Sequence, residues 1–455
     1  MKTITLSKTV VCALFVGSVV SGCSVAPSSN PSSSPTAVSS AGATGEPSKT
    51  ALDWSKLDDP SLKGKTITVI LVDPDGKLTD ITKKFTEQTG IKVNVIGVDY
   101  NSLYGKITTA SLSNSSDIDV IEMDTIWAGQ FFKGNIAEDL TTVIPADVLK
   151  KYTQSSLDSV IYDKHVVAMP YYSSTKHQYW NKEMLKKAGY DAPPKTLDEF
   201  RAMSKKLTQS GIYASGWSWK QAESLNIDFG TIVSAMGGKF VDEKGQIKVN
   251  SKEAVAALQY MSDLINVDKT VDPGSLQWTE DDVKNAFAAG KISLMNNWEG
   301  MFTDLNDPTK SQVVGKSDMS LIPGQGSVVS AAISGSEGIA IMKSSKNKQA
   351  ALAFLKWIGS KDFQLADYKE KGVYPALAEL YTDPQVIALD ESKTIGKVLE
   401  QFNYGFNRPN APGYVEWADI LSNQIYSALI MKQTPQQALD EAAVKIDEAI
   451  KRAAK

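Results

Sequence analysis

The sequence between residues 65 and 124 alternates segments typical of β-strands with segments typical of α-helices. The β-branched run KTITVILVD (65–73) is followed by KLTDITKKFTEQTG (77–90), whose large apolar residues recur at helical spacing. IKVNVIGV (91–98) then alternates apolar and polar residues, and after a further helical stretch comes the apolar run DIDVIEMD (117–124). This order of elements favours a largely parallel sheet covered by helices. We therefore predict an α/β fold.

Helix starts recur later in the chain. Thr196 with Glu199 and Thr434 with Gln437 have the spacing of capping boxes, in which side chains accept hydrogen bonds from otherwise unpaired backbone N–H groups. No repeat of fixed period is evident.

The first 22 residues predict a lipoprotein signal peptide. Lys2 and Lys8 accompany an apolar stretch of about a dozen residues, too short for a bilayer span that needs about 20 helical residues. The segment VSGC (20–23) resembles the bacterial lipobox, in which cleavage precedes a cysteine that is then acylated. We expect residues 1–22 to be removed and Cys23 to carry lipid. The alternative is an ordinary signal peptide that happens to end near a cysteine.

The residues after Cys23 predict a flexible tether. Ser, Pro, Ala, Gly and Thr dominate up to about Thr50, and such a composition buries too little apolar surface to fold. We assign the lipidated cysteine and tether to 23–59. The only other cysteine, Cys12, lies in the signal, so the mature chain has no disulfide, thiol nucleophile or thiolate metal site.

Size and charge bound what the remaining chain can do. Roughly 400 residues with ordinary apolar content exceed what one small core supports, so two lobes are expected. The formal net charge is -4, and -6 without Lys2 and Lys8, with no basic cluster. A nucleic-acid partner is therefore not expected.

Five stretches in the same order resemble the extracellular solute-binding proteins of family 1, the sugar-type receptors of ABC importers and relatives of maltose- and trehalose-binding proteins. The likeness runs from about Lys65 to the end. The stretches are 117–140, 169–200, 288–305, 336–360 and 408–447.

The resemblance implies a two-lobe periplasmic-binding-protein fold of type II-like topology, with a ligand enclosed between lobes that close about a hinge. Crossovers are expected near 171–175, 330–335 and 373–376. The N-terminal lobe is expected to comprise 60–171 and 335–373, and the C-terminal lobe 172–334 and 374–455.

The resemblance also implies which side chains hold the sugar. An apolar sugar face packs on aromatic rings, while its hydroxyls pair with carboxylates and arginine. Trp298 matches a stacking tryptophan, Tyr172 a cleft tyrosine, Asp124 a hydroxyl-binding aspartate and Arg408 an arginine near the sugar. The alternatives are core packing for Trp298, a helix N-cap for Asp124 and a surface salt bridge for Arg408.

Further candidates follow from position in the matched stretches. Asp73 and Asp75 come directly after the first strand, and the pattern does not choose between them. Trp127 either covers Asp124 or packs within its own lobe. Trp417 matches a cleft aromatic residue but also suits the buried face of a helix. Trp217 and Trp219 alternate as in a strand, so we expect only one of these two tryptophans, with Trp219 as the candidate, to face a cleft.

Two departures from the family pattern concern the ligand. Gly335-Ser336-Glu337 stands where many relatives read Gly-Gly-Trp, so an acid replaces one stacking platform, and Ser174 stands where an aspartate is common. An amino sugar, a polyamine or another polar solute is therefore an alternative to a neutral sugar.

Other functions are less well supported by the residues. A glycosidase would need two carboxyl groups about 5–9.5 Å apart on either side of the scissile glycosidic bond, and the candidates are Asp124, Glu299 and Glu337. Binding of sugar hydroxyl groups explains the same acids without a catalysed reaction. His165 and His177 support neither a metal site nor a catalytic triad. A lipid-anchored sensor or adhesin is the remaining alternative class.

We therefore expect a substrate-binding lipoprotein that is not an enzyme and that needs no cofactor or metal. It would act as a monomer outside the cytoplasm, anchored to the cell membrane. It would bind a carbohydrate, most simply an oligosaccharide, and deliver it to a membrane permease of an ABC importer.

Overall fold

The computed structural model describes residues 52–73, 75–209, 212–242, 246–390 and 392–453. The chain divides into two compact units, Met1–Thr50 and Ala51–Lys455, and only the second is described. The predicted signal peptide and Cys23 lie outside the described residues, as does the predicted tether up to residue 51.

The last residues of the predicted tether are packed against the folded unit. Leu57 is buried, and the amide of Gln349 links both ways to Asp53, accepting from its N–H at 3.1 Å and donating to its carbonyl at 2.7 Å. This difference from the sequence prediction arises because Leu52, Trp54 and Leu57 supply apolar surface that joins the core.

A five-stranded sheet contains the first strands of the unit. Its order is β2 (Lys92–Val98), β1 (Thr66–Val72), β3 (Val120–Asp124), β12 (Glu337–Ile341) and β6 (Met169–Tyr172). β1 pairs in parallel with β2 and β3, whereas β12 runs antiparallel to both β3 and β6. The carboxyl ends of β1, β2, β3 and β6 therefore meet the amino end of β12 at one edge.

Helices cover this sheet because their apolar residues face it. In α1 (Lys77–Thr89), Leu78, Ile81 and Phe85 are buried at helical spacing, and Gly90 ends the helix in the left-handed conformation at φ 74°. Phe85 packs edge-on against Phe354 of α12 (Lys348–Ile358). The predicted α/β pattern of residues 65–124 is thus observed.

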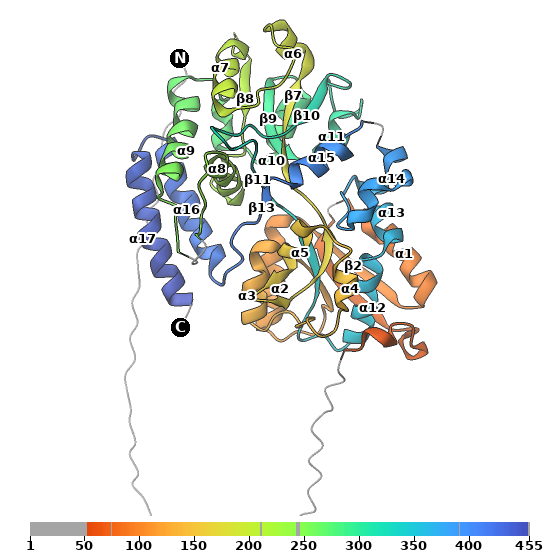
Figure 1. The fold of residues 1–455 in the computed structure, drawn as a ribbon. Coiled ribbons are helices and arrows are strands. Elements are labelled where there is room, and N and C mark those ends of the chain that lie inside the picture. Colours follow the sequence, from red (N-terminus) through yellow and green to blue (C-terminus); the bar gives the residue numbers. More distant parts are fainter. Residues whose placement is uncertain (1–51, 74, 210–211, 243–245, 391, 454–455) are drawn as a thin grey trace, which may run out of the picture. The chain divides into compact units, whose positions relative to one another are not determined.

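A second, four-stranded sheet has the order β10 (Ser317–Ser320), β7 (Lys176–Asn181), β9 (Ile292–Trp298) and β8 (Tyr213–Gly216). The helices α9 (Lys252–Ser262), α16 (Tyr414–Leu429) and α17 (Pro435–Ala453) lie side by side in this part of the unit (Figure 1). α8 (Glu223–Ala235) is buried along almost its whole length.

Two segments run between the two sheets, and a third, residues 373–376 between α13 (Lys361–Lys371) and a 3-10 helix (Ala378–Thr382), lies against the first of them. Residues 173–175 join β6 to β7, and residues 334–336 lead into β12. Gly335 N donates to Ser174 O at 2.9 Å, and Ser173 N donates to Tyr374 O at 3.1 Å. The sequence places the crossovers near 171–175, 330–335 and 373–376, and their role as hinges between lobes stays a prediction.

Helix capping follows the sequence with one exception. Thr434 and Gln437 form both bonds of a capping box. Thr196 caps α7 (Leu197–Leu207), but the Glu199 carboxylate accepts from Lys195 N instead of from Thr196 N. A complete capping box that the sequence analysis missed opens α10 (Glu280–Ala288), with Thr279 and Asp282.

The remaining elements are short or peripheral. They are the helices α2 (Tyr100–Leu112), α3 (Ala128–Lys133), α4 (Ala146–Leu149), α5 (Gln154–Val160), α6 (Lys182–Lys187), α11 (Met301–Leu305), α13 (Lys361–Lys371), α14 (Pro384–Leu389) and α15 (Ile395–Phe402), and the strands β4 (Ile161–Tyr162), β5 (His165–Val166), β11 (Ala332–Ile333) and β13 (Gly405–Phe406). Among the described residues, none of the helices is both long enough and apolar enough to cross a membrane.

Candidate functional site

Polar side chains gather where the strands of the five-stranded sheet end. Asp73 and Asp75 follow β1, Tyr100 follows β2, Asp124 ends β3, and Tyr172 ends β6. Glu337 starts β12 directly opposite Asp124 and Tyr172. Crevices at the carboxyl ends of strands are where open α/β sheets bind ligands.

A groove lies along this edge, and we call it the strand-end groove. It consists of two adjoining depressions of about 260 and 660 Å³ that share Asp75, Lys77 and Lys371. The smaller depression is also lined by Val72, Asp73, Glu122, Tyr171, Tyr172 and Val373. The larger one adds residues that follow β9 of the other sheet, including Gly300, Phe302 and Thr303. The groove is thus lined by the edge of the five-stranded sheet and by the segment that follows β9 of the other sheet.

The two aspartates after β1 play different structural parts. Asp73 is buried, and its Oδ2 accepts from Leu78 N at 3.0 Å, so one oxygen fixes the start of α1. Asp75 is exposed and lines both depressions. Of the two, Asp75 has the freer carboxylate.

Three carboxyl groups share one face of the sheet near its strand ends, and of the three it is Glu122 that lines the groove. Glu122 and Asp124 are two residues apart in β3, and Glu337 lies opposite Asp124. Glu122 Oε2 accepts from Val72 N at 2.5 Å. Burial raises the pKa of Glu337 well above its usual range, and the neighbouring carboxyls of Glu122 and Asp124 raise it further. Burial likewise raises the pKa of Glu122.

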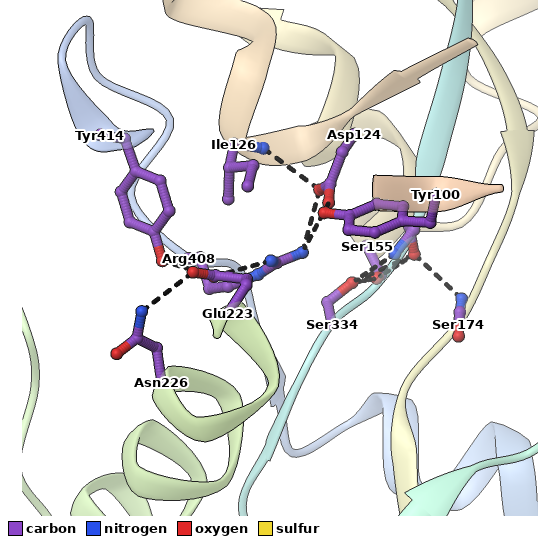
Figure 2. A network of polar contacts seen from close by, with 11 residues as sticks. Tyr100, Asp124, Ile126, Ser155, Ser174, Glu223, Asn226, Ser334, Arg408 and Tyr414 are labelled. Carbon is purple, nitrogen blue, oxygen red and sulfur yellow. Dashed lines mark hydrogen bonds and ion pairs between the residues drawn. The ribbon is translucent and has the colours of Figure 1, made fainter. Parts of the chain in front are cut away.

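Arg408 holds two acids from separate parts of the chain (Figure 2). Its guanidinium donates to Asp124 Oδ1 at 2.9 Å and to Glu223 Oε1 at 2.9 Å. Tyr414 OH also donates to Glu223 Oε1, and Asn226 donates to Glu223 Oε2. Arg408 is 4% exposed, so the ion pair is buried and not the surface salt bridge considered from sequence.

Asp124 is therefore saturated with protein donors. Besides Arg408, it accepts from Tyr100 OH at 2.5 Å and from Ile126 N at 3.3 Å, the latter as the N-cap of a 3-10 helix (Thr125–Trp127). Trp127 is buried and stacks on Tyr100 with ring centroids 5.8 Å apart. Trp127 thus supports the tyrosine that contacts Asp124.

Trp298 is half-buried beside the crossovers. Its ring lies over Lys176 Nζ at 5.4 Å from the centroid, and Lys176 is itself buried and paired with Asp228 at 2.8 Å. A Cβ added at Gly335 would lie 2.7 Å from Trp298 Cζ3. The glycine of the second crossover is therefore what allows the indole to pack there.

Glu299 connects β9 to the first crossover. Its Oε2 accepts from Thr175 N at 3.0 Å and from Ser174 Oγ at 3.2 Å. Burial raises the pKa of Glu299 to about 7. Ser174 N also donates to Ser336 Oγ, which belongs to a cluster with Ser155 and Ser334 (Figure 2).

Trp219 and Trp417 lie in apolar cores. The strand β8 ends at Gly216, so Trp217 and Trp219 do not alternate but stack on each other at 5.4 Å, both buried. Trp417 is 1% exposed and borders a separate cavity of about 700 Å³, lined also by Phe240, Phe406 and Ile450. The structure brings neither tryptophan to the strand-end groove.

Sequence reasoning missed four residues at this site. Two of them could have been predicted from their positions in the sequence. Tyr100 follows a strand, as Asp73 does, and Glu122 is two residues before Asp124, so its side chain is on the same face of the strand. Glu223 and Lys371 could not, since they reach the site from α8 and α13 through tertiary packing alone.

The described residues contain no group of three or more His, Cys, Asp or Glu side chains arranged to hold a metal ion. Among the acids near the groove, Asp124 pairs with Arg408, while Asp73 and Glu122 each accept from a backbone N–H group.

The model of the bacterial extracellular solute-binding protein family matches residues 71–365. The chain belongs to this family, as its sequence pattern predicts.

Curated and solved relatives agree with this assignment. The chain is 29% identical over 339 residues to a probable ABC transporter-binding protein of Deinococcus radiodurans, covering 72% of this chain and 79% of that protein. It is similar to the maltose-bound T. maritima MalE3, with a TM-score of 0.77, 28% identity and coverage of 84% and 99%. It is also similar to a solute-binding protein of Agrobacterium radiobacter K84 in complex with ribitol, with a TM-score of 0.76 and 28% identity. That match covers 86% of this chain and 99% of the other. The fold is thus the two-lobe fold of periplasmic sugar-binding proteins.

Proposed function

We propose that this protein is the substrate-binding lipoprotein of an ABC importer and that it binds a carbohydrate in the strand-end groove for delivery to a membrane permease. The observation that carries the proposal is the groove itself, because carboxylates and a tyrosine at the strand ends line it together with residues 300–304, which follow β9 of the other sheet. Such a lining matches a ring with hydroxyl edges and apolar faces.

The two sheets support the expected lobes. We propose that 60–171 with 335–373 form one lobe and 172–334 with 374–455 the other. In support, the strands of each sheet fall within one of these sets, except that Tyr172, the last residue of β6, lies at the boundary between them. Closure of such lobes is favoured by a ligand that contacts both of them.

Two solved relatives support a sugar-like ligand. One is described as maltose-bound and the other as a complex with ribitol. Both ligands carry several hydroxyl groups, from which the exposed carboxylate of Asp75 would accept hydrogen bonds.

Thermal unfolding of residues 50–455 tests the function. The panel contains mono- and oligosaccharides, sugar alcohols, amino sugars, polyamines and amino acids. A ligand at a hundredfold over its Kd stabilises the native state by about 2.7 kcal/mol, which raises Tm by several degrees. A shift with a carbohydrate series supports the proposal, whereas a shift only with amino acids or polyamines contradicts it.

We further propose that Cys23 carries lipid and holds the protein on the outer face of the cell membrane. The support is the VSGC segment after a short apolar stretch and the serine- and proline-rich residues that follow. Acyl chains bind membranes with about 0.8 kcal/mol for each buried methylene, so more than one chain gives a firm anchor.

Fractionation of producing cells tests the anchor. The parent protein should partition with membranes and into detergent, and Cys23→Ser should abolish both the lipid mass and the membrane fraction. Cys12→Ser is the control, and it should leave the protein on the membrane.

A further inference from the structure

We propose that Glu299 is a positioning residue of the strand-end groove, which fixes the separation of the two walls of the groove and acts on ligand affinity without contacting the ligand. The first wall, which we call the sheet wall, is the edge of the five-stranded sheet and includes Tyr172. The second, the 300–307 wall, is the segment that follows β9. The inference rests on the proposed carbohydrate-binding function and concerns the same groove.

Glu299 lies where the chain leaves β9 and enters the 300–307 wall. Trp298 is the last residue of β9, and Gly300 lines the larger depression. Glu299 itself is 5% exposed and lines neither depression. Its side chain therefore acts on the groove through the neighbouring chain segments.

The Glu299 carboxylate is bonded to the crossover that leaves the sheet wall. Its Oε2 accepts from Thr175 N at 3.0 Å and from Ser174 Oγ at 3.2 Å. Both donors closely follow Tyr172, which ends β6 and lines the smaller depression. These two hydrogen bonds thus join the chain segments from which the two walls diverge, and we call them the wall tie.

Backbone pairing stops just before this point. The ladder between β7 and β9 ends with Lys176 opposite Trp298. Thr175 and Glu299 are the next residues beyond that pair, and the carboxylate continues the connection there. Thr175 is 0% exposed, and without the carboxylate its N–H would lack this acceptor, which buried backbone groups rarely tolerate. Loss of the carboxylate should therefore move the crossover away from β9.

Both ends of the wall tie are held by further bonds. Tyr179 OH donates to the carbonyl oxygens of Trp298 at 2.6 Å and Glu299 at 3.0 Å. On the other side, Gly335 N donates to Ser174 O at 2.9 Å. The wall tie thus links two segments that are themselves fixed, so it can set the distance between the walls.

A fixed distance between the walls favours a ligand that contacts both of them. Ordering mobile contact groups during binding costs free energy, and a site that is ordered beforehand avoids this cost. Supporting residues that hold contact groups in place are part of a precise binding site even when they do not touch the ligand. Glu299 has this role in the groove.

The first test measures the wall separation without any ligand, as the distance between two spin labels. Lys84→Cys places one label on α1, which follows the first strand of the sheet wall, and Thr309→Cys places the other just after the 300–307 wall; both positions are exposed. The full chain also carries Cys12→Ser and Cys23→Ser, so that only the introduced cysteines react. We expect a longer and broader distance distribution in Glu299→Ala than in the labelled parent.

Two further variants distinguish positioning from a general loss of stability. Glu299→Gln should restore the parent distribution, because its amide oxygen can accept the same two bonds. Asp119→Ala is the matched control, since Asp119 is buried and accepts from Thr68 N at 2.9 Å and from Ser345 Oγ at 2.5 Å. It lies at the amino end of β3, away from the groove, and should leave the walls unchanged.

The second test measures affinity. Maltose and ribitol are titrated calorimetrically into the unlabelled full chain in detergent. The Kd of a sugar that binds the parent should rise at least about tenfold in Glu299→Ala and stay within about threefold in Glu299→Gln and Asp119→Ala. If Glu299→Ala does not fold, Ser174→Ala replaces it in both tests, because it removes one of the two donors, and the changes should have the same direction.

The outcomes separate this inference from the proposed function. An unchanged wall distance in Glu299→Ala overturns the inference, and so does a change that Glu299→Gln fails to reverse or that Asp119→Ala reproduces. Wider walls with unchanged affinity for a sugar that the parent binds also overturn it. If the walls change as expected but no carbohydrate of the thermal panel binds the parent, the proposed function fails while the role of Glu299 in wall separation stands.

Discussion

Single buried residues carry most of the electrostatic organisation near the groove. Arg408, Asp124 and Lys176 are all less than 5% exposed, yet each is charged and paired. Removing one member of a buried pair costs far more than removing an exposed one, because the remaining charge is left without compensation.

Arg408→Met should therefore destabilise the protein by about 3–5 kcal/mol, because Asp124 and Glu223 both lose their cation. Arg452→Met is the matched control, since Arg452 is exposed and pairs with exposed Glu416, and it should cost less than about 1 kcal/mol. Urea unfolding of the two variants measures the difference. Equal costs would contradict the assignment of Arg408 to a buried network.

Glu299 should give the stability a distinct pH dependence. Its ordinary pKa of 4.5 rises to about 7 in the fold, so between these values the native state holds a proton that the unfolded state has lost. Its contribution is fully present below pH 4.5 and is lost as the pH rises through 7, by on the order of 3 kcal/mol. His177, whose pKa burial lowers to about 4, acts in the opposite direction as the pH falls below 6.5.

Comparison of the parent protein with Glu299→Gln isolates this effect. The stability of Glu299→Gln relative to the parent should rise between pH 4.5 and 7 and then stay level. The free energy of unfolding from urea titrations at several pH values gives the curve. A difference that does not change with pH would show that Glu299 titrates normally.

At the scale of elements, the crossovers are built around one close contact between a loop and a strand. Gly335 lies in the second crossover, and Trp298 ends β9. The space between them admits no Cβ without a shift of the indole. The packing of residues 334–336 and the position of Trp298 are thus coupled.

Gly335→Ala should displace the Trp298 ring and destabilise the protein by about 1–3 kcal/mol. The intrinsic fluorescence of the folded state should change as well. Gly105→Ala in α2 is the control, because nothing lies within 4 Å of its added Cβ, and alanine should stabilise that helix by up to about 1 kcal/mol. Unchanged fluorescence and stability in Gly335→Ala would contradict the tight contact.

For the whole molecule, local patterns predicted the fold and the family correctly. The alternation of strands and helices in 65–124 depends on periodicity within each segment, which the sequence displays directly. The position of Asp73 directly after the first strand was also visible in the sequence, whereas Asp124 and Tyr172 were assigned from the family resemblance.

The partners of those residues could not be read in the same way. Arg408 is 284 positions from Asp124, and no periodicity links them. Trp219 and Trp417 are buried because of the helices that pack on them, and a sequence motif does not distinguish such a tryptophan from one in a cleft. The ion pair of Arg408 and the burial of the two tryptophans depend on packing between residues far apart in the sequence.

The central claim is that the ligand binds in the strand-end groove between the two lobes. The most direct test is a crystal structure of the protein with the carbohydrate that stabilises it most in the thermal panel. We expect the sugar to contact Asp75 and Tyr172 on one side and residues near Gly300 on the other. A sugar bound instead in the cavity beside Trp417, with the strand-end groove empty, would contradict it.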